Sequence, residues 1–93
     1  MNFLARTTDK GWRVISVSSV DIVAAAAAVS VTLTDATSVG AEIHNAGVNT
    51  IFISNTAADA TAYELREGER MFLAGVISVF STDGSTLKIM RVA

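Results

Sequence analysis

The residues of this chain that could do chemistry are few, and they form no catalytic set. The one imidazole is His44, in the context Ile43-His44-Asn45 at the end of a predicted strand. Nucleophilic catalysis needs a nucleophile beside a base that a third group orients. The Ser and Thr residues of this chain form the polar half of alternating strands, and a histidine at a strand end is usually structural. We therefore expect no catalytic residue and no enzymatic activity.

Carboxylates are the second group that could act as acids, bases or metal ligands. Glutamates surround Gly68 and alternate with arginines, which is the pattern of a solvated turn (Glu64, Arg66, Glu67, Glu69 and Arg70). Four aspartates lie at predicted strand ends or turns, where Asp supports the local backbone (Asp21, Asp35, Asp59 and Asp83). No spacing matches a calcium loop, and a chain with one His and no Cys lacks the usual zinc ligands. The sequence predicts no metal site and no cofactor.

Nucleic-acid and membrane partners are not indicated either. The net charge is −2, and the basic residues form no stripe. The glycines stand singly at turns, so no glycine-rich loop is present to hold a phosphate. The longest apolar run, residues 22–29, is too short to span a bilayer. The first residues lack the apolar region of a signal peptide, so we expect a protein that is made in the cytoplasm.

Strand patterns dominate the elements that must position these residues. Apolar and polar side chains alternate with the period of a half-buried strand, and Gly, Asn and Asp lie between the alternating runs. The pattern predicts eight strands, at residues 13–18, 29–34, 41–44, 50–54, 62–65, 70–73, 76–81 and 86–92. Short strands separated by turn signals every 8–12 residues are typical of sandwiches and small barrels.

Two segments need a separate interpretation. Asp83-Gly84 lies between the last two alternating runs, which predicts a hairpin with a type I′ turn and positive φ at both residues. The alanines Ala24 to Ala28 are too few for a stable helix and have β-branched neighbours. We interpret them as an extended strand or linker whose small side chains allow another surface to approach, with a single helical turn as the alternative.

The sequence thus predicts an all-β fold: a small antiparallel β-sandwich or barrel of seven to eight short strands with an extended N-terminal arm. Residues 1–12 show no periodicity and are assigned to the arm, and residues 13–93 are assigned to the sandwich domain. The large side chains Phe3, Leu4 and Trp12, with Arg13, are the expected partner-binding anchors of the arm, because Trp and Arg are enriched at binding hot spots.

The composition favours burial of surface by partners. Hydrophobic residues make up 51% of the 93 residues, and mean hydropathy is +0.46. Charged residues are 17%, against about 25% in ordinary soluble domains. A domain of this size has little interior, and it has no disulfide to reinforce it. Subunit contacts are the favoured explanation; the alternative is that the many Ala and Val residues lie harmlessly on the surface.

Residues 41–93 resemble small virion proteins of tailed bacteriophages. The resemblance rests on three segments: residues 41–47 (AEIHNAG), residues 50–53 (TIFI) and residues 63–69 (YELREGE). In those proteins a strand that ends in Asn-x-Gly leads to a second strand, then to a Gly-Glu corner and a closing hairpin. The resemblance implies a capsid decoration (cement) protein that binds and stabilises the assembled phage head. Residues 1–28 match no part of that pattern.

Such a role implies no cofactor and a location in the virion, after assembly in the host cytoplasm. The implied partner is the major capsid protein or another virion protein, and the chain itself is expected to form a homo-oligomer such as a trimer. The alternatives are a head-completion, connector or tail component, a host-surface or carbohydrate-binding β-module, and a small hydrolase that uses His44. The β-module would normally display more aromatic side chains than this chain has.

Overall fold

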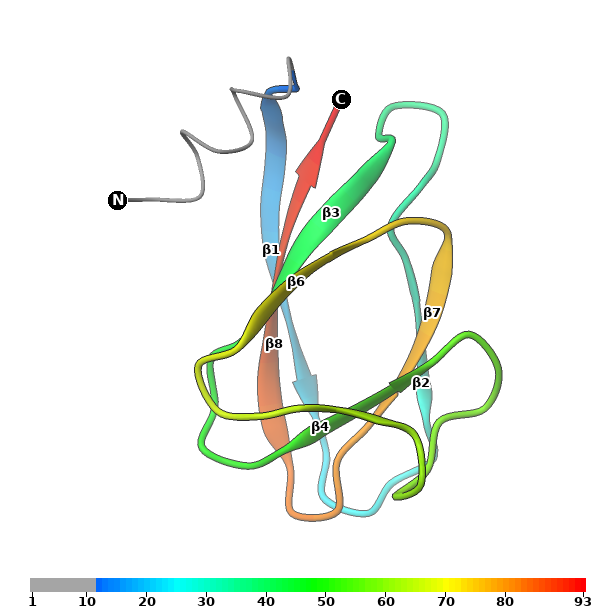
Figure 1. Cartoon of the computed structure of the whole chain (residues 1–93), viewed down its shortest axis with the longest axis vertical. Helices are drawn as coiled ribbons and strands as arrows, with labels where there is room; N and C mark the ends of the chain where they lie inside the picture. Colours follow the sequence, from blue (N-terminus) through cyan, green and yellow to red (C-terminus); the bar gives the residue numbers. More distant parts are fainter. Residues whose placement is uncertain (1–11) are drawn as a thin grey trace.

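A computed structural model describes residues 12–93 of the chain, and all of its regular structure is β (Figure 1). The strands are β1 (Val14–Ile22), β2 (Val29–Thr32), β3 (Gly40–Asn45), β4 (Ile51–Ser54), β5 (Tyr63–Leu65), β6 (Arg70–Leu73), β7 (Val76–Phe80) and β8 (Ser85–Val92). Each of the eight predicted strands is therefore present, with ends shifted by up to four residues. The predicted all-β sandwich is confirmed.

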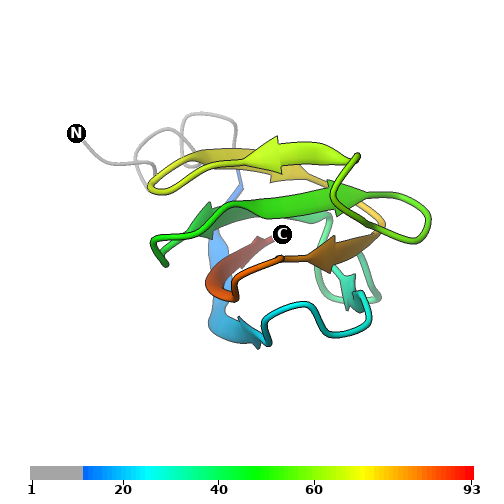
Figure 2. The same cartoon turned by 90° about the horizontal axis from the view of Figure 1, so that it is seen from below.

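The strands form two antiparallel sheets of four, which lie face to face (Figure 2). One sheet has the order β1-β8-β3-β6, and the other has the order β2-β7-β4-β5. Only β4 and β5 are consecutive strands that pair with each other. Every other connection crosses from one sheet to the other. This strand order is that of an eight-stranded jelly roll, which is built from two Greek keys.

The core lies between the two sheets and takes alternate side chains from the strands, except that those of β6, Met71 and Leu73, are only partly buried against it. In β3, Ala41 and Ile43 point into the core, and in β8 Leu87 and Ile89 do the same. The other members of the core cluster come from all remaining strands except β6 and from the segment after β2 (Ile22, Val31, Leu33, Ile51, Ile53, Leu65, Ile77 and Val79). Side chains that alternate along these strands must therefore cover the outside of the sandwich.

The predicted hairpin at Asp83-Gly84 is wrong. β7 pairs with β2 and β4, whereas β8 pairs with β1 and β3, so the turn joins two sheets rather than two paired strands. Gly84 has a φ of 84°, but Asp83 is not in the left-handed region, so the turn is not of type I′. The connection is the four-residue segment 81–84, and its first residue, Ser81, is fully buried. Its hydroxyl donates to the carbonyl of Thr50 and accepts from the amide of Gly84.

The alanine segment forms a turn followed by an extended linker. The amide of Ala26 donates to the carbonyl of Val23, and the amide of Ala25 donates to Ser81 in the β7–β8 connection. Ala25 has a φ of 54°, the left-handed conformation that disfavours a Cβ atom. The segment is therefore a linker that contains neither a strand nor a helix, and the close approach that the structure shows is made by the missing side chain of Gly84. A Cβ on Gly84 would lie 3.2 Å from the amide nitrogen of Ala24.

Asn45, the last residue of β3, is the centre of a hydrogen-bond network at one end of the sandwich. Its side chain is fully buried, and every hydrogen-bonding position of its amide is used. Nδ2 donates to the carbonyls of Asn49 (2.8 Å) and Leu65 (2.9 Å). Oδ1 accepts from the amide of Gly47 (3.1 Å) and from the hydroxyl of Ser85 (2.8 Å). One side chain thus binds the ends of β3, β5 and β8.

The backbone of the same residue extends this network. The carbonyl of Asn45 accepts from Gly68, and its amide donates to Glu69, so the β5–β6 connection is anchored there as well. Asn49 in turn donates its side-chain amide to the carbonyls of Asp83 and Gly84. Three connections that cross between the sheets, at residues 46–50, 66–69 and 81–84, are therefore linked around one buried amide.

Replacement of Asn45 by Ala should strongly destabilise the domain. The substitution removes both donors and the acceptor from a buried network, and each buried group left without a partner costs about 1–3 kcal/mol, so we expect a loss of roughly 3 kcal/mol in the free energy of unfolding. Urea denaturation followed by Trp12 fluorescence measures the change. Asn55→Ala, an exposed amide in the β4–β5 loop, is the matched control and should have little effect. Equal effects of the two substitutions would contradict the assigned role of Asn45.

Replacement of Ala25 by Gly should stabilise the domain. Glycine adopts the left-handed conformation without the steric cost of a Cβ, and the gain exceeds its entropic cost by about 0.5–1 kcal/mol. Ala27→Gly is the control: Ala27 is exposed in the same linker but has no positive φ, so that substitution should give no gain. The free energy of unfolding of each variant is measured and compared with that of the wild type. A destabilised Ala25→Gly variant would contradict the assigned turn.

Candidate functional site

The candidate site lies on the outer face of the β1-β8-β3-β6 sheet, which we call the outer face below. Strand register places its side chains in rows that run across the strands. His44 of β3 is opposite Arg70 of β6 on one side and opposite Lys88 of β8 on the other. Side chains directly opposite each other have Cβ atoms about 4.5–5.5 Å apart. Arg70, His44 and Lys88 therefore form a row of three basic side chains, which we call the basic row.

The next row on the same face is mainly apolar. Glu42 is opposite Phe72 of β6 and Met90 of β8, and Met90 is opposite Val17 of β1. Glu42 and Met90 are both buried, with exposed fractions of 5%. Val17, by contrast, is 68% exposed. The carboxylate of Glu42 is thus the acidic group that faces the basic row from the neighbouring row.

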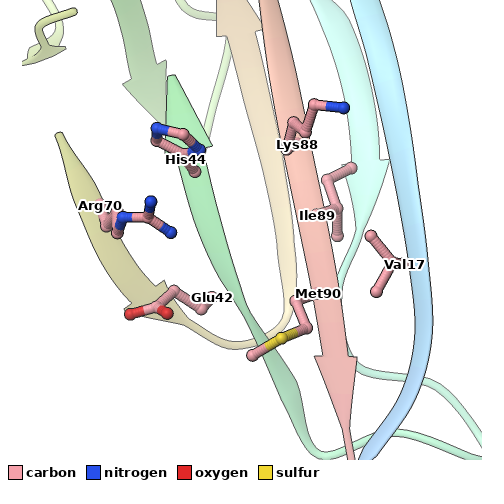
Figure 3. A pocket seen from close by; sticks show the side chains of 7 residues that line it. All are labelled: Val17, Glu42, His44, Arg70, Lys88, Ile89 and Met90. Carbon is pink, nitrogen blue, oxygen red and sulfur yellow. The ribbon is translucent and has the colours of Figure 1, made fainter. Parts of the chain in front are cut away.

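Between the two rows the face is hollowed (Figure 3). The hollow has a volume of about 330 Å³ and is lined by Val17, Glu42, His44, Arg70, Lys88, Ile89 and Met90. Figure 3 shows the guanidinium of Arg70 between His44 and Glu42, and the side chain of Lys88 extending toward β1. The charged groups of Arg70, His44 and Glu42 therefore lie together at the β3 and β6 side of the hollow, and the apolar side chains of Met90 and Val17 lie at the β8 and β1 side (Figure 3).

The surroundings of His44 lower the pKa of its imidazole. Partial burial lowers its pKa below the ordinary value, and the positive charges of Arg70 and Lys88 lower it further. The carboxylate of Glu42 acts in the opposite direction and does not compensate. The imidazole of His44 is therefore neutral at neutral pH, and its protonation would place three positive charges in one row.

Two of the four predicted arm anchors, Trp12 and Arg13, are among the described residues. Phe3 and Leu4 are outside the residues that the structure describes. The ring of Trp12 stacks on Phe72, with centroids 4.9 Å apart and an interplanar angle of 18°. Phe72 in turn covers Gly40, where a Cβ would lie 2.9 Å from the ring. The aromatic pair therefore extends the apolar row at the β6 edge of the outer face.

Arg13 continues β1, in line with its assignment to the predicted strand at residues 13–18. Its amide and carbonyl exchange hydrogen bonds of 3.0 Å with Ala93, the residue that follows β8. Its side chain is exposed and does not line the hollow. The residues that do line the hollow were not singled out together by the sequence, because they come from four strands. The i, i+2 spacing of Glu42 and His44 was the one local signal that the two share a face.

The arrangement offers charge and apolar contact rather than an obvious nucleophile. None of the described residues that line the hollow is a Ser, Thr or Cys. Within residues 12–93, no three His, Asp or Glu side chains are grouped so that they could hold a metal ion. The helix needed to cross a membrane is likewise not found in the described part of the chain. His44 nevertheless lies half-buried on a central strand, not on a flat exposed edge.

The other carboxylates behave as turn residues. Asp35 accepts from the backbone amides and hydroxyls of Thr37 and Ser38, and these hydrogen bonds lower its pKa. Asp59 accepts from the amide and hydroxyl of Thr61, which lowers its pKa in the same way. In the predicted charged turn, Glu69 accepts from the amide of Arg66, and the Arg66 side chain pairs with Glu64 at 3.3 Å in an exposed position. These groups stabilise loops.

Comparison of the chain with protein-family models, curated proteins and solved structures gives no match.

Removal of each of three charged neighbours should shift the pKa of His44 in the direction set by the sign of the charge that is removed. Lys88→Gln and Arg70→Gln should raise it, and Glu42→Gln should lower it. NMR titration of the imidazole Hε1 signal measures each value. Arg66→Gln, which removes an arginine outside the hollow, is the control and should leave the pKa unchanged. A pKa that is the same in all variants would contradict the basic row.

The same perturbation makes stability depend on pH. Because the folded-state pKa of His44 lies below its unfolded value, the unfolded chain binds a proton more readily. Stability is therefore present in full above the unfolded pKa of about 6.5 and falls as the pH drops through it toward the folded pKa. Urea unfolding measures this effect. Between pH 7.5 and pH 5.5, the free energy of unfolding should decrease less in His44→Gln than in the wild type.

Proposed function

We propose that the chain is a non-enzymatic structural protein of a virus particle, and more narrowly a decoration (cement) protein of a tailed-phage head. The jelly-roll strand order supports the broader part, because this architecture is common in viral capsid proteins, although it also occurs in lectins and cupins. The resemblance of residues 41–93 to small phage virion proteins supports the narrower part. A fold alone does not assign a function, which depends on the groups that the surface presents.

The observation that carries the proposal is the apolar surface that the described domain leaves exposed. Nine large hydrophobic side chains are exposed beyond a third of their surface, namely Ile15, Val17, Val23, Val29, Val39, Val48, Tyr63, Phe72 and Val76. On the outer face, Val17 and Phe72 belong to the apolar row beside the hollow. Apolar and aromatic groups with a few charges around them are typical of the centre of a protein interface.

A decoration protein needs no chemistry, because binding only to the assembled shell stabilises that shell by mass action. Each contact can be weak when many copies bind one lattice, since linked contacts gain from their effective concentration. In this proposal the outer face contacts the major capsid protein or another virion protein. The domain itself forms a homo-oligomer, with a trimer as one closed form. Phe3 and Leu4 remain predicted anchors of the arm.

Antibody labelling of particles tests the role directly. Antibodies raised against the purified domain are applied to particles from the source culture and examined by electron microscopy. We expect labels distributed over heads at many sites, in numbers that scale with the shell lattice. Labels at a single vertex would assign a connector, and labels on tails would assign a tail component. Particles without label, in a culture where the protein is detected, would contradict a virion role.

Rebinding of the purified protein to heads that have been depleted of it tests whether the outer face is the docking surface. Val17→Ser removes an apolar group from the outer face, and we expect about a tenfold loss of affinity, as for one interface contact worth roughly 1.4 kcal/mol. Val76→Ser is the matched control, because Val76 is similarly exposed but lies on the other sheet. Quantitative pull-down with the heads measures both variants. A loss confined to Val76→Ser would place the docking surface on the opposite side of the sandwich.

A further inference from the structure

We propose that the hollow on the outer face binds a carboxylate carried on an apolar framework, namely an acidic side chain of the partner protein, and that binding strengthens as His44 gains a proton. The inference rests on the proposed function and names the group that docks on this face. It is drawn from three features of the described residues: the register of the basic row, the apolar floor beside it, and the charges that face His44.

The hollow carries more positive than negative charge. Arg70 and Lys88 are each directly opposite His44, so protonation of His44 would place like charges opposite each other on the sheet, which is destabilising. Glu42, in the neighbouring row, is the single carboxylate among the described residues that line the hollow. Two cations therefore face one acidic group, and a third cation is added when His44 is protonated. A carboxylate from outside balances this excess of positive charge.

The floor of the hollow determines what else the ligand must carry. Met90 is buried below the rim, and Val17 is 68% exposed beside it. An apolar chain that covers Val17 gains from removing that surface from water. Arg70 supplies the planar donor geometry that suits a carboxylate, and Lys88 supplies a flexible point charge. A glutamate side chain combines two methylene groups with a carboxylate and fits a volume of about 330 Å³.

The charges of the whole chain argue against a polyanion as the occupant. The net charge is −2, and the basic residues of the described strands form no stripe beyond this row. A nucleic acid would need phosphate contacts along an extended basic surface. An isolated carboxylate on a protein surface needs only this local group of cations. The occupant is therefore an acidic side chain of a protein.

Protonation of His44 and binding of the carboxylate should strengthen each other. The groups that face the imidazole are Arg70 from β6, Lys88 from β8 and Glu42 from its own strand. The two cations oppose protonation, and a bound carboxylate would offset them. By linkage, a ligand that raises the pKa of His44 binds more tightly at a pH where His44 is protonated. Affinity should therefore rise as the pH falls from 7.5 to 5.5.

An NMR titration of the full chain with N-acetylglutamate amide tests this site. N-acetylglutamine amide, which has the same shape without the charge, is the matched probe. We expect saturable shifts of the amide signals of Glu42, His44 and Lys88 with a dissociation constant on the order of millimolar, since one side chain makes few contacts. The constant should be about threefold smaller at pH 5.5 than at 7.5, and the Hε1 titration of His44 should move upward with the ligand.

Three variants separate the parts of the proposal. Arg70→Gln and Lys88→Gln should each weaken binding at both pH values, whereas His44→Gln should retain binding and lose its pH dependence. Arg66→Gln is the control and should bind as wild type. Equal binding of the glutamine probe would overturn the proposal. So would the absence of saturable shifts, or tighter binding of inorganic phosphate than of the glutamate probe.

The outcome is independent of the test of the virion role. Heads that carry the label, together with no binding of the glutamate probe, would remove this site and leave the decoration role intact. Binding of the probe without labelled particles would establish the carboxylate site and remove the virion role.

Discussion

The buried amide of Asn45 is the interaction on which the rest of this sandwich depends. In a jelly roll almost every connection crosses between the sheets, so consecutive strands do not hold each other in place by pairing. The crossings must be fixed by other contacts, and here the two donors and one acceptor of Asn45 fix them. Gly47 is part of the same arrangement, because a Cβ there would collide with the hydroxyl of Ser85. The Asn-x-Gly pattern is therefore required by the packing of three connections.

The strands of this fold could be predicted from the sequence, but their partners could not. Alternation of side chains is local, and it located all eight strands. Pairing depends on contacts between distant segments, and the turn chemistry of Asp83-Gly84 is the same for a hairpin and for a crossing. What distinguishes the crossing is the buried Ser81, which binds Thr50, and the amide of Asn49, which binds the turn carbonyls. These partners lie more than thirty residues away in sequence.

The same limit applies to the candidate site. Glu42 and His44 could be placed on one face from their spacing, but Arg70 and Lys88 join them only through the register of β3 with β6 and β8. His44 was therefore expected to be an ordinary residue at a strand end, whereas it lies in a hollow between two cations. Trp12, similarly, was expected in an arm. Its stacking on Phe72 connects it to the face of the sheet, and no local pattern could have predicted that contact.

The division between core and face lets one strand serve stability and recognition separately. In β3, Ala41 and Ile43 are fully buried between the sheets, while Glu42 and His44 line the hollow on the opposite side. Arg91 of β8 shows the core-side role of a cation: it joins the sheets by donating to the carbonyl of Thr32 on β2. Lys88, three residues earlier on the same strand, makes no such bridge among the described residues and is exposed at the hollow. Because most of the side chains that line the hollow are not members of the core cluster, the charge of the outer face can vary while the core and the network of Asn45 keep the strands in register.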